Sequence, residues 1–399
     1  MGPLTGMKVI DLTHVMAGPT CTLMLADMGA DVIKVEKVPD GDDTRRSLPP
    51  QIGDEAAAFM MMNRNKRGIA LDLKKENGRT ILKRLLADAD VVVENYRPGT
   101  MAKLGFDYDE LRQQNPGLIY CALSGFGRSG PYGHRGGFDL VAQAMSGLMS
   151  ITGEAPGRAP VKCGAPVTDI TCGILAAMGI LAAYSHRLQT GEGQMVDTSL
   201  LEAGIVQTYW QSAIAFATNE APGPMGSAHP LNAPYQAFEC SDGWIVIGGS
   251  NQRNWLRALE ALEANHLAED ERFIDNAARM ANLKALEDTL APFFKRHSAT
   301  TLLARFEAVG VPAGPVYDVL QMQADPQVRA REMVTSVEHV NEGSIETIGL
   351  PVKFSATPGK VRTGAPTYGQ HSREVLLEAG FSDAELATFA AEGAVITNE

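Results

Sequence analysis

A single carboxylate, Asp169, directly precedes a segment without any charged residue, residues 170–184. A helix that is apolar on every face is normally buried, because a solvated helix keeps a polar stripe. The pattern therefore predicts that Asp169 enters the interior at the start of a helix. An aspartate there can cap the first backbone N–H groups, or it can act as a nucleophile or a general base. The spacing leaves both roles open.

Basic residues follow several predicted strands of the N-terminal part. Lys37 ends a strand at 31–35, Arg45 and Arg46 come soon after it, and Lys74 follows a strand at 69–73. Ligands of open parallel sheets bind beyond the carboxyl ends of the strands. A phosphorylated ligand could therefore be held there, although any one of these clusters could instead be solvated surface.

The elements that must position these residues alternate between strand and helix. A strand at 8–12, a helix at 20–28 and the strand at 31–35 form a βαβ unit, which implies a parallel sheet. Further elements are a helix at 78–87, strands at 91–93, 118–123 and 194–197, and a helix through 149 that Asp139 could cap. The turn after the first strand, THVMAGP, lacks the GxGxxG of a dinucleotide site, so NAD is not expected.

A second region begins after the Gly- and Pro-rich stretch 221–234, which marks a domain boundary. A hairpin at 235–247 and amphipathic helices near 252–264, 281–295 and 299–309 indicate a smaller α+β domain. A strand pair at 334–340 and 344–348 and a helix at 371–379 follow. The expected fold class is α/β, with a large Rossmann-like domain and this smaller domain.

Composition excludes several classes of protein. The net charge of −12 argues against a sequence-independent nucleic-acid binder or a protein of anionic membranes. The five cysteines are scattered without CxxC or Cys/His clusters, which predicts a reducing compartment and no structural zinc. The N-terminus lacks the layout of a signal peptide, and the apolar run after Asp169 is shorter than a bilayer span and is interrupted by Gly179. We expect a cytoplasmic protein without a membrane partner.

Motifs in a shared order make the chain resemble the class III coenzyme A-transferases, the family of formyl-CoA transferase and carnitine CoA-transferase. They are VIDLTHVMAGP, GADVIKVE, GDDTR, NRNKRGIALDLK, ENYRPGTMAKLGF, SGFGRSGP, FDLVAQAMSGLM, PVTDITCGI, TGEGQMVDTSLLEA, PYQAFECSDGWIVIG, VPAGPV and GQHSREVL. The resemblance implies a Rossmann-like domain built from 1–220 and 326–399, a small domain at 221–325, and an interlocked homodimer. It also implies that coenzyme A is a substrate and that no tightly bound cofactor is present.

The same resemblance assigns roles to individual residues. Asp169 matches the catalytic aspartate, and the implied coenzyme A contacts are His14, Val15, Ala17, Lys37, Leu71, Lys74, Asn95, Tyr96 and Lys103. The implied chemistry is attack of Asp169 on a thioester, through a mixed anhydride and an aspartyl-CoA thioester. Gly248 and Gly249 resemble the start of a mobile glycine loop that closes over the site, or they form a plain hairpin turn.

Two departures from the family pattern bear on the substrate. Formyl- and oxalate-specific members carry a glutamine where this chain has Met16, and a lysine where it has Gly136, so oxalate is not the first expectation. Other runs are closer to members that use succinyl-CoA and dicarboxylates. Arg45 and Arg46 could then pair with the distal carboxylate, contact coenzyme phosphates, or remain at the surface.

Two alternative functions remain to be weighed. An α-methylacyl-CoA racemase-like isomerase would resemble relatives with a histidine directly before Asp139, but this chain has Phe138 there and His134 is out of register. A non-catalytic CoA-binding protein is disfavoured because Asp169 is present.

Overall fold

The computed structural model describes residues 1–397, and the chain divides into two compact units. The larger unit takes Met1–Gly147, Cys163–Gln207 and the segment from Pro326, and the smaller unit takes Leu148–Lys162 and Thr208–Asp325. The sequence predicts the first boundary at 220. The chain crosses earlier because helix α10 (Tyr209–Thr218), which precedes the Gly- and Pro-rich stretch, belongs to the smaller unit, as does an excursion before α8.

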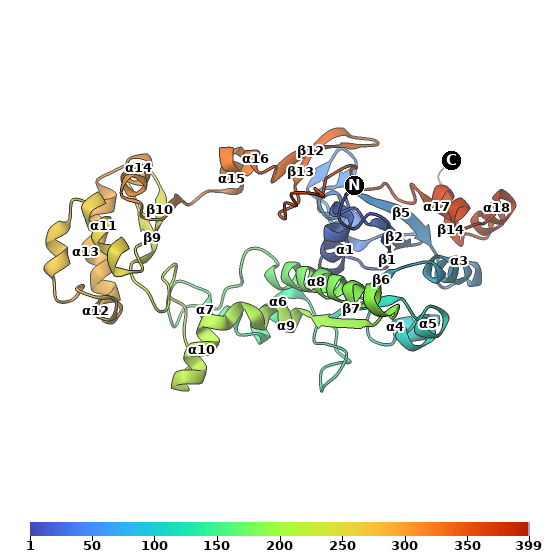
Figure 1. Cartoon of the computed structure of the whole chain (residues 1–399), viewed down its shortest axis with the longest axis horizontal. Helices are drawn as coiled ribbons and strands as arrows, with labels where there is room; N and C mark the ends of the chain where they lie inside the picture. The colour runs from blue at the N-terminus through green and yellow to red at the C-terminus, as the bar shows by residue number, and fades with distance from the viewer. Residues whose placement is uncertain (398–399) are drawn as a thin grey trace. The chain divides into compact units, whose positions relative to one another are not determined.

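The larger unit is built on a seven-stranded sheet in the order β14-β5-β2-β1-β6-β7-β8 (Figure 1). The strands are β1 (Lys8–Asp11), β2 (Asp31–Lys37), β5 (Lys66–Leu71), β6 (Val91–Glu94), β7 (Ile119–Ser124), β8 (Met195–Ser199) and β14 (Val395–Ile396). All pairs are parallel except β14 with β5. Strand order reverses between β1 and β6, as in doubly wound α/β folds, and ligands of such folds bind at this switch point.

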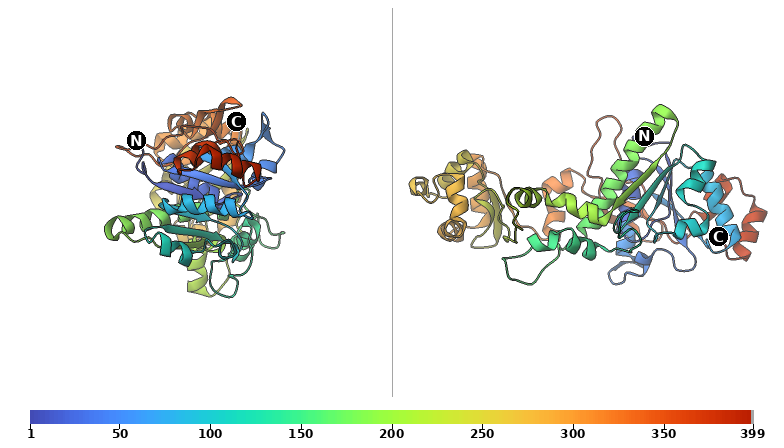
Figure 2. Two further views of the ribbon diagram at one scale, coloured as in Figure 1. Left: turned by 90° about the vertical axis from the view of Figure 1, so that its right-hand side faces the viewer. Right: turned by 90° about the horizontal axis from the view of Figure 1, so that it is seen from below.

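Helices cover both faces of the sheet, so its strands are apolar on both sides. One face packs against α3 (Glu76–Ala87), α17 (Ser372–Glu378) and α18 (Asp383–Ala391), and the other against α1 (Ala17–Asp27) and α8 (Val167–Thr190). In the right-hand view of Figure 2, the green α8 and the red C-terminal helices lie on opposite sides of the strands. The Rossmann-like α/β architecture predicted from the sequence is confirmed.

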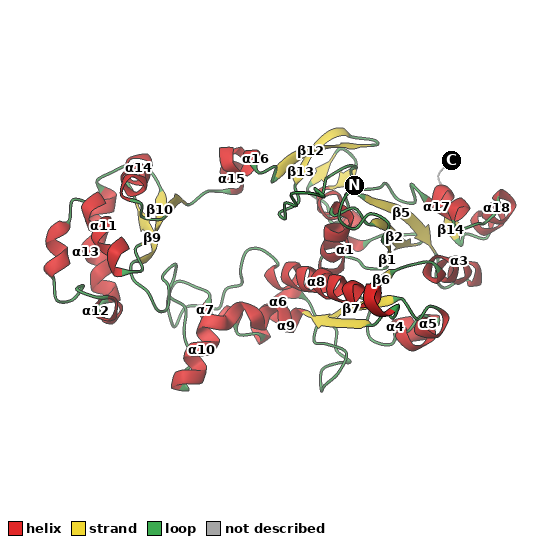
Figure 3. Cartoon of the chain, viewed as in Figure 1, coloured by secondary structure: helices red, strands yellow, loops and turns green. Residues whose placement is uncertain are grey.

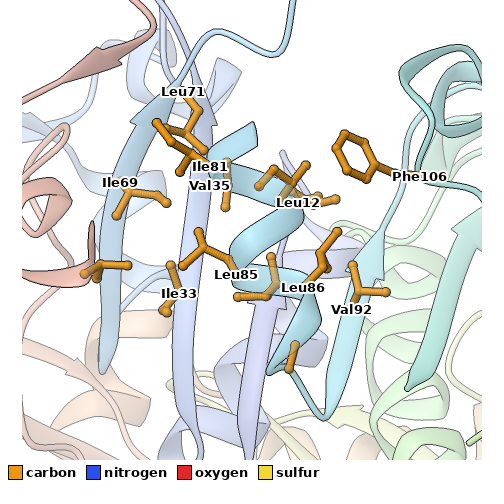
Figure 4. Close-up of a cluster of buried hydrophobic side chains, with 14 of the residues drawn as sticks. Leu12, Ile33, Val35, Ile69, Leu71, Ile81, Leu85, Leu86, Val92 and Phe106 are labelled. Atoms are coloured by element: carbon orange, nitrogen blue, oxygen red, sulfur yellow. The ribbon is translucent and has the colours of Figure 1, made fainter. Parts of the chain in front are cut away.

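Helix α3 shows how the local pattern produces this packing. Ile81, Leu82, Leu85 and Leu86 recur at helical spacing and are all buried. They meet strand side chains from the sheet in one core cluster (Figure 4). Each buried aliphatic side chain contributes roughly 1.5–3 kcal/mol relative to exposure.

Helix α8 is only half covered in the single chain, whereas the sequence predicts burial on every face. Cys172, Ala176 and Ile180 are buried on the side that packs against α1. On the other side Ile174 is 44% exposed and Met178 is 61% exposed. The uncharged part of α8, residues 170–184, therefore leaves an apolar face that residues 1–397 do not cover.

The length of α8 also differs from the sequence prediction. The helix runs for 24 residues without a break at Gly179. A Cβ added to Gly179 would lie 2.7 Å from Val196 Cγ1, so the glycine allows close approach to β8. By length and composition α8 is the one helix within residues 1–397 that could cross a membrane, a criterion that core helices also meet.

The smaller unit combines a three-stranded antiparallel sheet with helices (Figure 3). Strands β9 (Tyr235–Glu239), β10 (Trp244–Gly248) and β11 (Ala313–Pro315) pack with α11 (Gln252–Ala261), α13 (Leu283–Lys295) and α14 (Ala299–Val309). Phe238 stacks on Phe294 with ring centroids 4.2 Å apart, at the centre of this core. The remaining named elements include α2 (Ala57–Met62), α4 (Thr100–Leu104), α5 (Tyr108–Gln114), α6 (Asp139–Met145), α7 (Leu148–Ile151), α9 (Leu200–Ile205), α12 (Asn276–Ala281), α15 (Val319–Ala324), α16 (Pro326–Ala330), and the hairpin β12 (Val334–His339) with β13 (Gly343–Ile348).

Candidate active site

The loops after β1 and β6 are joined at the switch point of the sheet by one side-chain amide. Asn95 Nδ2 donates to the His14 carbonyl oxygen at 2.8 Å, and Asn95 Oδ1 accepts from the His14 N–H at 3.0 Å. The two parallel strands thus end in loops that cannot separate without losing both hydrogen bonds. This fixes the floor of the crevice where a ligand is expected.

Val15 has a backbone conformation that is unusual for its residue type. Its φ is +69°, in the left-handed region that β-branched residues rarely adopt. Such strain costs about 1–3 kcal/mol and persists only where the surroundings enforce it. The Val15 N–H donates to Asp42 Oδ1 at 3.2 Å, so Asp42 is one group that holds the loop.

A buried network of charges supports this loop from below. Lys34 Nζ lies 2.8 Å from Asp42 Oδ2 and donates to the Thr13 carbonyl oxygen at 2.9 Å. Lys66 Nζ lies 3.0 Å from Asp11 Oδ2, and the four charged side chains are fully buried. Burial by itself would raise the pKa of Asp11, but the two lysines lower it to about 2. Lys66 therefore supports the protein core and is not available to a bound phosphate.

Asp139 holds the first turn of α8. Its Oδ1 accepts hydrogen bonds from the Thr168 N–H at 3.0 Å and from Thr168 Oγ1 at 2.7 Å. Its Oδ2 accepts from Gln143 Nε2 at 2.7 Å. Asp139 was expected to cap its own helix, but it is the first residue of α6 and satisfies the start of α8 instead.

Asp169 lies inside the first turn of α8 and is not its cap. The helix starts at Val167, and Pro166 occupies the cap position. Within residues 1–397 no group donates a hydrogen bond to the Asp169 carboxylate, and the cap position that it could reach back to holds Pro166, which has no N–H. Burial, together with the negative charge of Asp139, raises the pKa of Asp169 to about 6. The carboxylate is thus desolvated and has free lone pairs, as a nucleophile requires.

A cavity of about 180 Å³ brings Asp169 together with the loops of the switch point. It is lined by His14, Val15, Met16, Ala17, Asn95, Tyr96, Arg97, Pro98, Leu123, Ser124, Gly125, Arg135, Gly136, Gly137, Phe138, Asp169 and Leu200. Five of the nine residues predicted to contact coenzyme A are in this set. All of the lining residues belong to the larger unit.

A second cavity of about 240 Å³ shares His14 and Tyr96 with the first. Its lining includes Lys37, Lys34 and Asp42. Lys37 Nζ forms an exposed ion pair with Asp43 at 2.6 Å, and exposed pairs of this kind hold each partner only weakly. Burial lowers the pKa of His14, so this imidazole is neutral at pH 7.

The other predicted coenzyme contacts lie outside both cavities. Leu71 is opposite Lys37 in the strand register, but its side chain belongs to the core (Figure 4). Lys74 follows β5 and Lys103 lies on α4, and both are exposed.

The two arginines expected to receive a distal carboxylate already have acidic partners. Arg45 Nε lies 2.7 Å from Glu36 Oε2, Arg45 Nη1 lies 3.2 Å from Glu55 Oε2, and the guanidinium carbon lies 3.6 Å from the Phe59 ring centroid. Arg46 pairs at the surface with two aspartates. Neither arginine lines the cavity of Asp169. The expectation for Arg45 is therefore corrected, since its charge is satisfied within the fold.

Gly248 and Gly249 belong to the smaller unit and connect β10 to α11, so the alternative of a plain hairpin turn is wrong. A Cβ on Gly249 would lie 2.9 Å from Pro234 Cγ, so the backbone is packed closely there. Asn254 Nδ2 donates to the Gly248 carbonyl oxygen at 3.3 Å.

Arg97 and Arg135 are the charged cavity residues that sequence reasoning missed. Arg97 is part of the ENYRPG motif, and Arg135 directly precedes the two glycines before Phe138 and Asp139. A possible signal was their position in loops at the carboxyl ends of β6 and β7.

The chain is similar to known proteins in sequence and in structure. The model of CoA-transferase family III matches residues 4–372. The chain is 39% identical to a succinate–glutarate CoA-transferase of Agrobacterium fabrum, over 94% of this chain and 95% of that protein. It is 41% identical to a succinyl-CoA:mesaconate CoA-transferase of Haloarcula hispanica, over 95% and 97%. A CAIB/BAIF family protein of Brucella suis has a similar crystal structure, with a TM-score of 0.84, 39% identity, and 95% and 99% of the chains covered.

Proposed function

This chain belongs to CoA-transferase family III, and we propose that it moves coenzyme A from succinyl-CoA to a dicarboxylic acid with Asp169 as the nucleophile. The observation that carries the proposal is the cavity in which a desolvated Asp169 carboxylate faces the loops of the switch point. The relatives named above act on succinate, glutarate or mesaconate, which are all dicarboxylates.

The first half-reaction transfers coenzyme A to the enzyme. A carboxylate oxygen of Asp169 attacks the thioester carbonyl carbon. The C–S bond breaks, CoA thiolate departs, and a mixed anhydride forms between Asp169 and the succinyl group. The thiolate then attacks the Asp169 carbonyl carbon, which gives an aspartyl-CoA thioester and releases succinate. With a pKa near 6, Asp169 is ionised at pH 7.5 yet little hydrated.

The second half-reaction reverses these bond changes with the acceptor. The acceptor carboxylate attacks the aspartyl thioester and expels CoA thiolate, and a new mixed anhydride forms. The thiolate attacks the acceptor acyl carbon, so that acyl-CoA leaves and the Asp169 carboxylate is restored. Both intermediates are sensitive to water, and the desolvated position of Asp169 favours transfer over hydrolysis.

Coenzyme A would extend from the second cavity, where Lys37 meets its phosphates, past His14 and Tyr96 to Asp169. Lys74, Lys103 and the backbone of Leu71 would contribute from the loops around that cavity. Gly248 and Gly249, at the end of β10, would form a mobile glycine loop.

A second copy of the chain is expected to cover the apolar face of α8. Ile174 and Met178 project from it without a partner in the single chain, and exposed apolar patches mark association sites. We therefore propose an interlocked homodimer in the cytoplasm. A racemase gains no support from the site, because Asp139 is engaged with Thr168 and Phe138 is 74% exposed.

The test is incubation with succinyl-CoA and a panel of carboxylic acids, with mass spectrometry for new acyl-CoA species. Hydroxylamine should convert the Asp169 mixed anhydride or thioester to a hydroxamate at that residue. Asp169→Asn, which preserves the shape of the side chain, should abolish both signals. Transfer that survives this substitution would disprove the mechanism.

A further inference from the structure

Arg97 and Arg135 bring positive charge into the cavity of Asp169. Among residues 1–397, neither has an acidic side chain within ion-pair distance, in contrast to Arg45, Arg64 and Arg67. A guanidinium beside a cavity without a carboxylate partner is available to a bound anion.

The loop 126–136 that carries Arg135 is closed at its base by two glycines. A Cβ added to Gly125 would lie 2.6 Å from the Gly137 Cα, and one added to Gly137 would lie 2.5 Å from the Gly125 Cα. Arg128 ties the loop to the sheet through hydrogen bonds to Glu94 Oε1 at 3.0 Å and to Asp197 Oδ2 at 3.1 Å. The loop is therefore a defined wall of the cavity.

An aromatic ring holds the Arg135 guanidinium. Its central carbon lies 4.1 Å from the Tyr132 ring centroid, and the Arg135 N–H donates to the Tyr132 carbonyl oxygen at 2.9 Å. Tyr132 in turn meets Phe126 edge to face, with centroids 5.8 Å apart. Stacking orients a guanidinium without neutralising it, so its N–H groups remain free to bind a carboxylate.

Arg135 and Arg97 border different parts of the cavity. Arg97 follows Asn95 and Tyr96, the loop shared with the second cavity and its Lys37. Arg135 precedes Gly136, Gly137 and Phe138, which continue the cavity wall, and this segment leads into Asp139, the partner of Thr168 beside Asp169. Arg135 thus stands on the side of the acyl group, and Arg97 on the side of the coenzyme.

We propose that Arg135 is a specificity-determining residue that pairs with the distal carboxylate of the dicarboxylic acyl group while Asp169 reacts at the other end. The inference rests on the proposed function. A second carboxylate would enter a cavity that already holds the negative charge of Asp169, with the charge of Asp139 close behind it, and repulsion would disfavour it without a cation. A guanidinium binds a carboxylate through two parallel hydrogen bonds, so Arg135 favours dicarboxylates over monocarboxylates of equal length.

The experiment compares glutarate with pentanoate, in which a methyl group replaces the distal carboxylate. Succinyl-CoA is the donor for both, and in a ping-pong reaction the kcat/KM for the acceptor reports the second half-reaction alone. Arg135→Gln should lower kcat/KM for glutarate at least about tenfold, mainly through KM. The value for pentanoate should change less than about twofold, and Arg135→Lys should restore part of the preference.

Arg112→Gln is the matched control, because Arg112 also lies near a tyrosine ring, that of Tyr108, but lines neither cavity. It should leave the preference for glutarate unchanged. The dissociation constant of free coenzyme A, measured by calorimetry, should be the same for Arg135→Gln and the wild type.

Equal losses for glutarate and pentanoate, or a weaker affinity for coenzyme A, would overturn the assignment of Arg135. An unchanged preference in Arg135→Gln would do the same. If the wild-type protein transferred coenzyme A to none of the acids tested, the proposed function itself would be disproved. This outcome differs from a failure of the Arg135 assignment, in which the wild type is active.

Discussion

The coenzyme side and the acyl side of the cavity are held in place by different kinds of interaction. Below His14 and Val15 lie buried ion pairs such as Lys34–Asp42, which tolerate little change. The wall around Arg135 is held by two closely approaching glycine backbones and by the Arg135 guanidinium, which lies over the Tyr132 ring. The named relatives share coenzyme A but differ in their acids. A rigid coenzyme side fits the shared coenzyme, and a wall whose residues can change fits the different acids.

The largest effect on activity should come from substitution of Asp169, which lies between the two sides. Asp169→Asn should lower kcat by at least about 1,000-fold, because no other carboxylate in the cavity can form the acyl intermediate. The melting temperature should not fall, since the substitution removes a half-buried carboxylate that has no hydrogen-bond donor. Acyl-CoA exchange followed by mass spectrometry, with a thermal melt, checks both outcomes.

The comparison predicts that substitutions on the coenzyme side mainly lower the stability of the fold. Asp42→Asn leaves Lys34 buried without its partner and weakens the hold on Val15, at a cost of about 3–5 kcal/mol. Asp43→Asn is the control, because Asp43 is exposed and its pair with Lys37 is worth at most about 1 kcal/mol. Thermal melts of the two variants should differ clearly, and equal melting temperatures would refute the role given to the buried network.

Substitutions in the wall around Arg135 should instead lower the activity, with little loss of stability. Gly137→Ala places a Cβ 2.5 Å from the Gly125 Cα, so the two backbone segments at the base of the loop must move apart. We expect kcat/KM for the acceptor to fall roughly tenfold while coenzyme A affinity is kept. Gly164→Ala, where an added Cβ meets nothing within 4 Å, should behave like the wild type. If Gly137→Ala weakened coenzyme A binding most, the division into two sides would be wrong.

The smallest effect concerns the pH dependence of the first half-reaction. Asp169 must be ionised to attack, so kcat/KM for succinyl-CoA should rise with pH and level off above the pKa of about 6. Asp139→Asn removes a negative charge that raises this pKa, so the inflection should move to lower pH. Rates measured between pH 5 and 8 decide the point, and an inflection that stays in place would exclude an influence of the Asp139 charge.

Local patterns in the sequence predicted most strands of the large sheet and the place of Asp169 at the start of a helix, but they left its role open. The strand β6 and the helix α3 follow from a run of valines and from leucines at helical spacing, which act over a few residues. The basic clusters were harder to interpret, because a lysine in a buried ion pair and a lysine that binds phosphate look alike in a sequence. Lys66 became structural through Asp11, 55 positions away.

The sequence by itself determined the α/β class with a parallel sheet, the family motifs and the position of Asp169 at the start of a helix. Only the tertiary structure decided what surrounds that carboxylate. The Thr168 N–H donates to Asp139, 29 positions away, and burial together with the Asp139 charge raises the pKa of Asp169. The structure likewise satisfied Arg45 and left Arg135 available, because ion pairing depends on distances in space that sequence spacing does not contain.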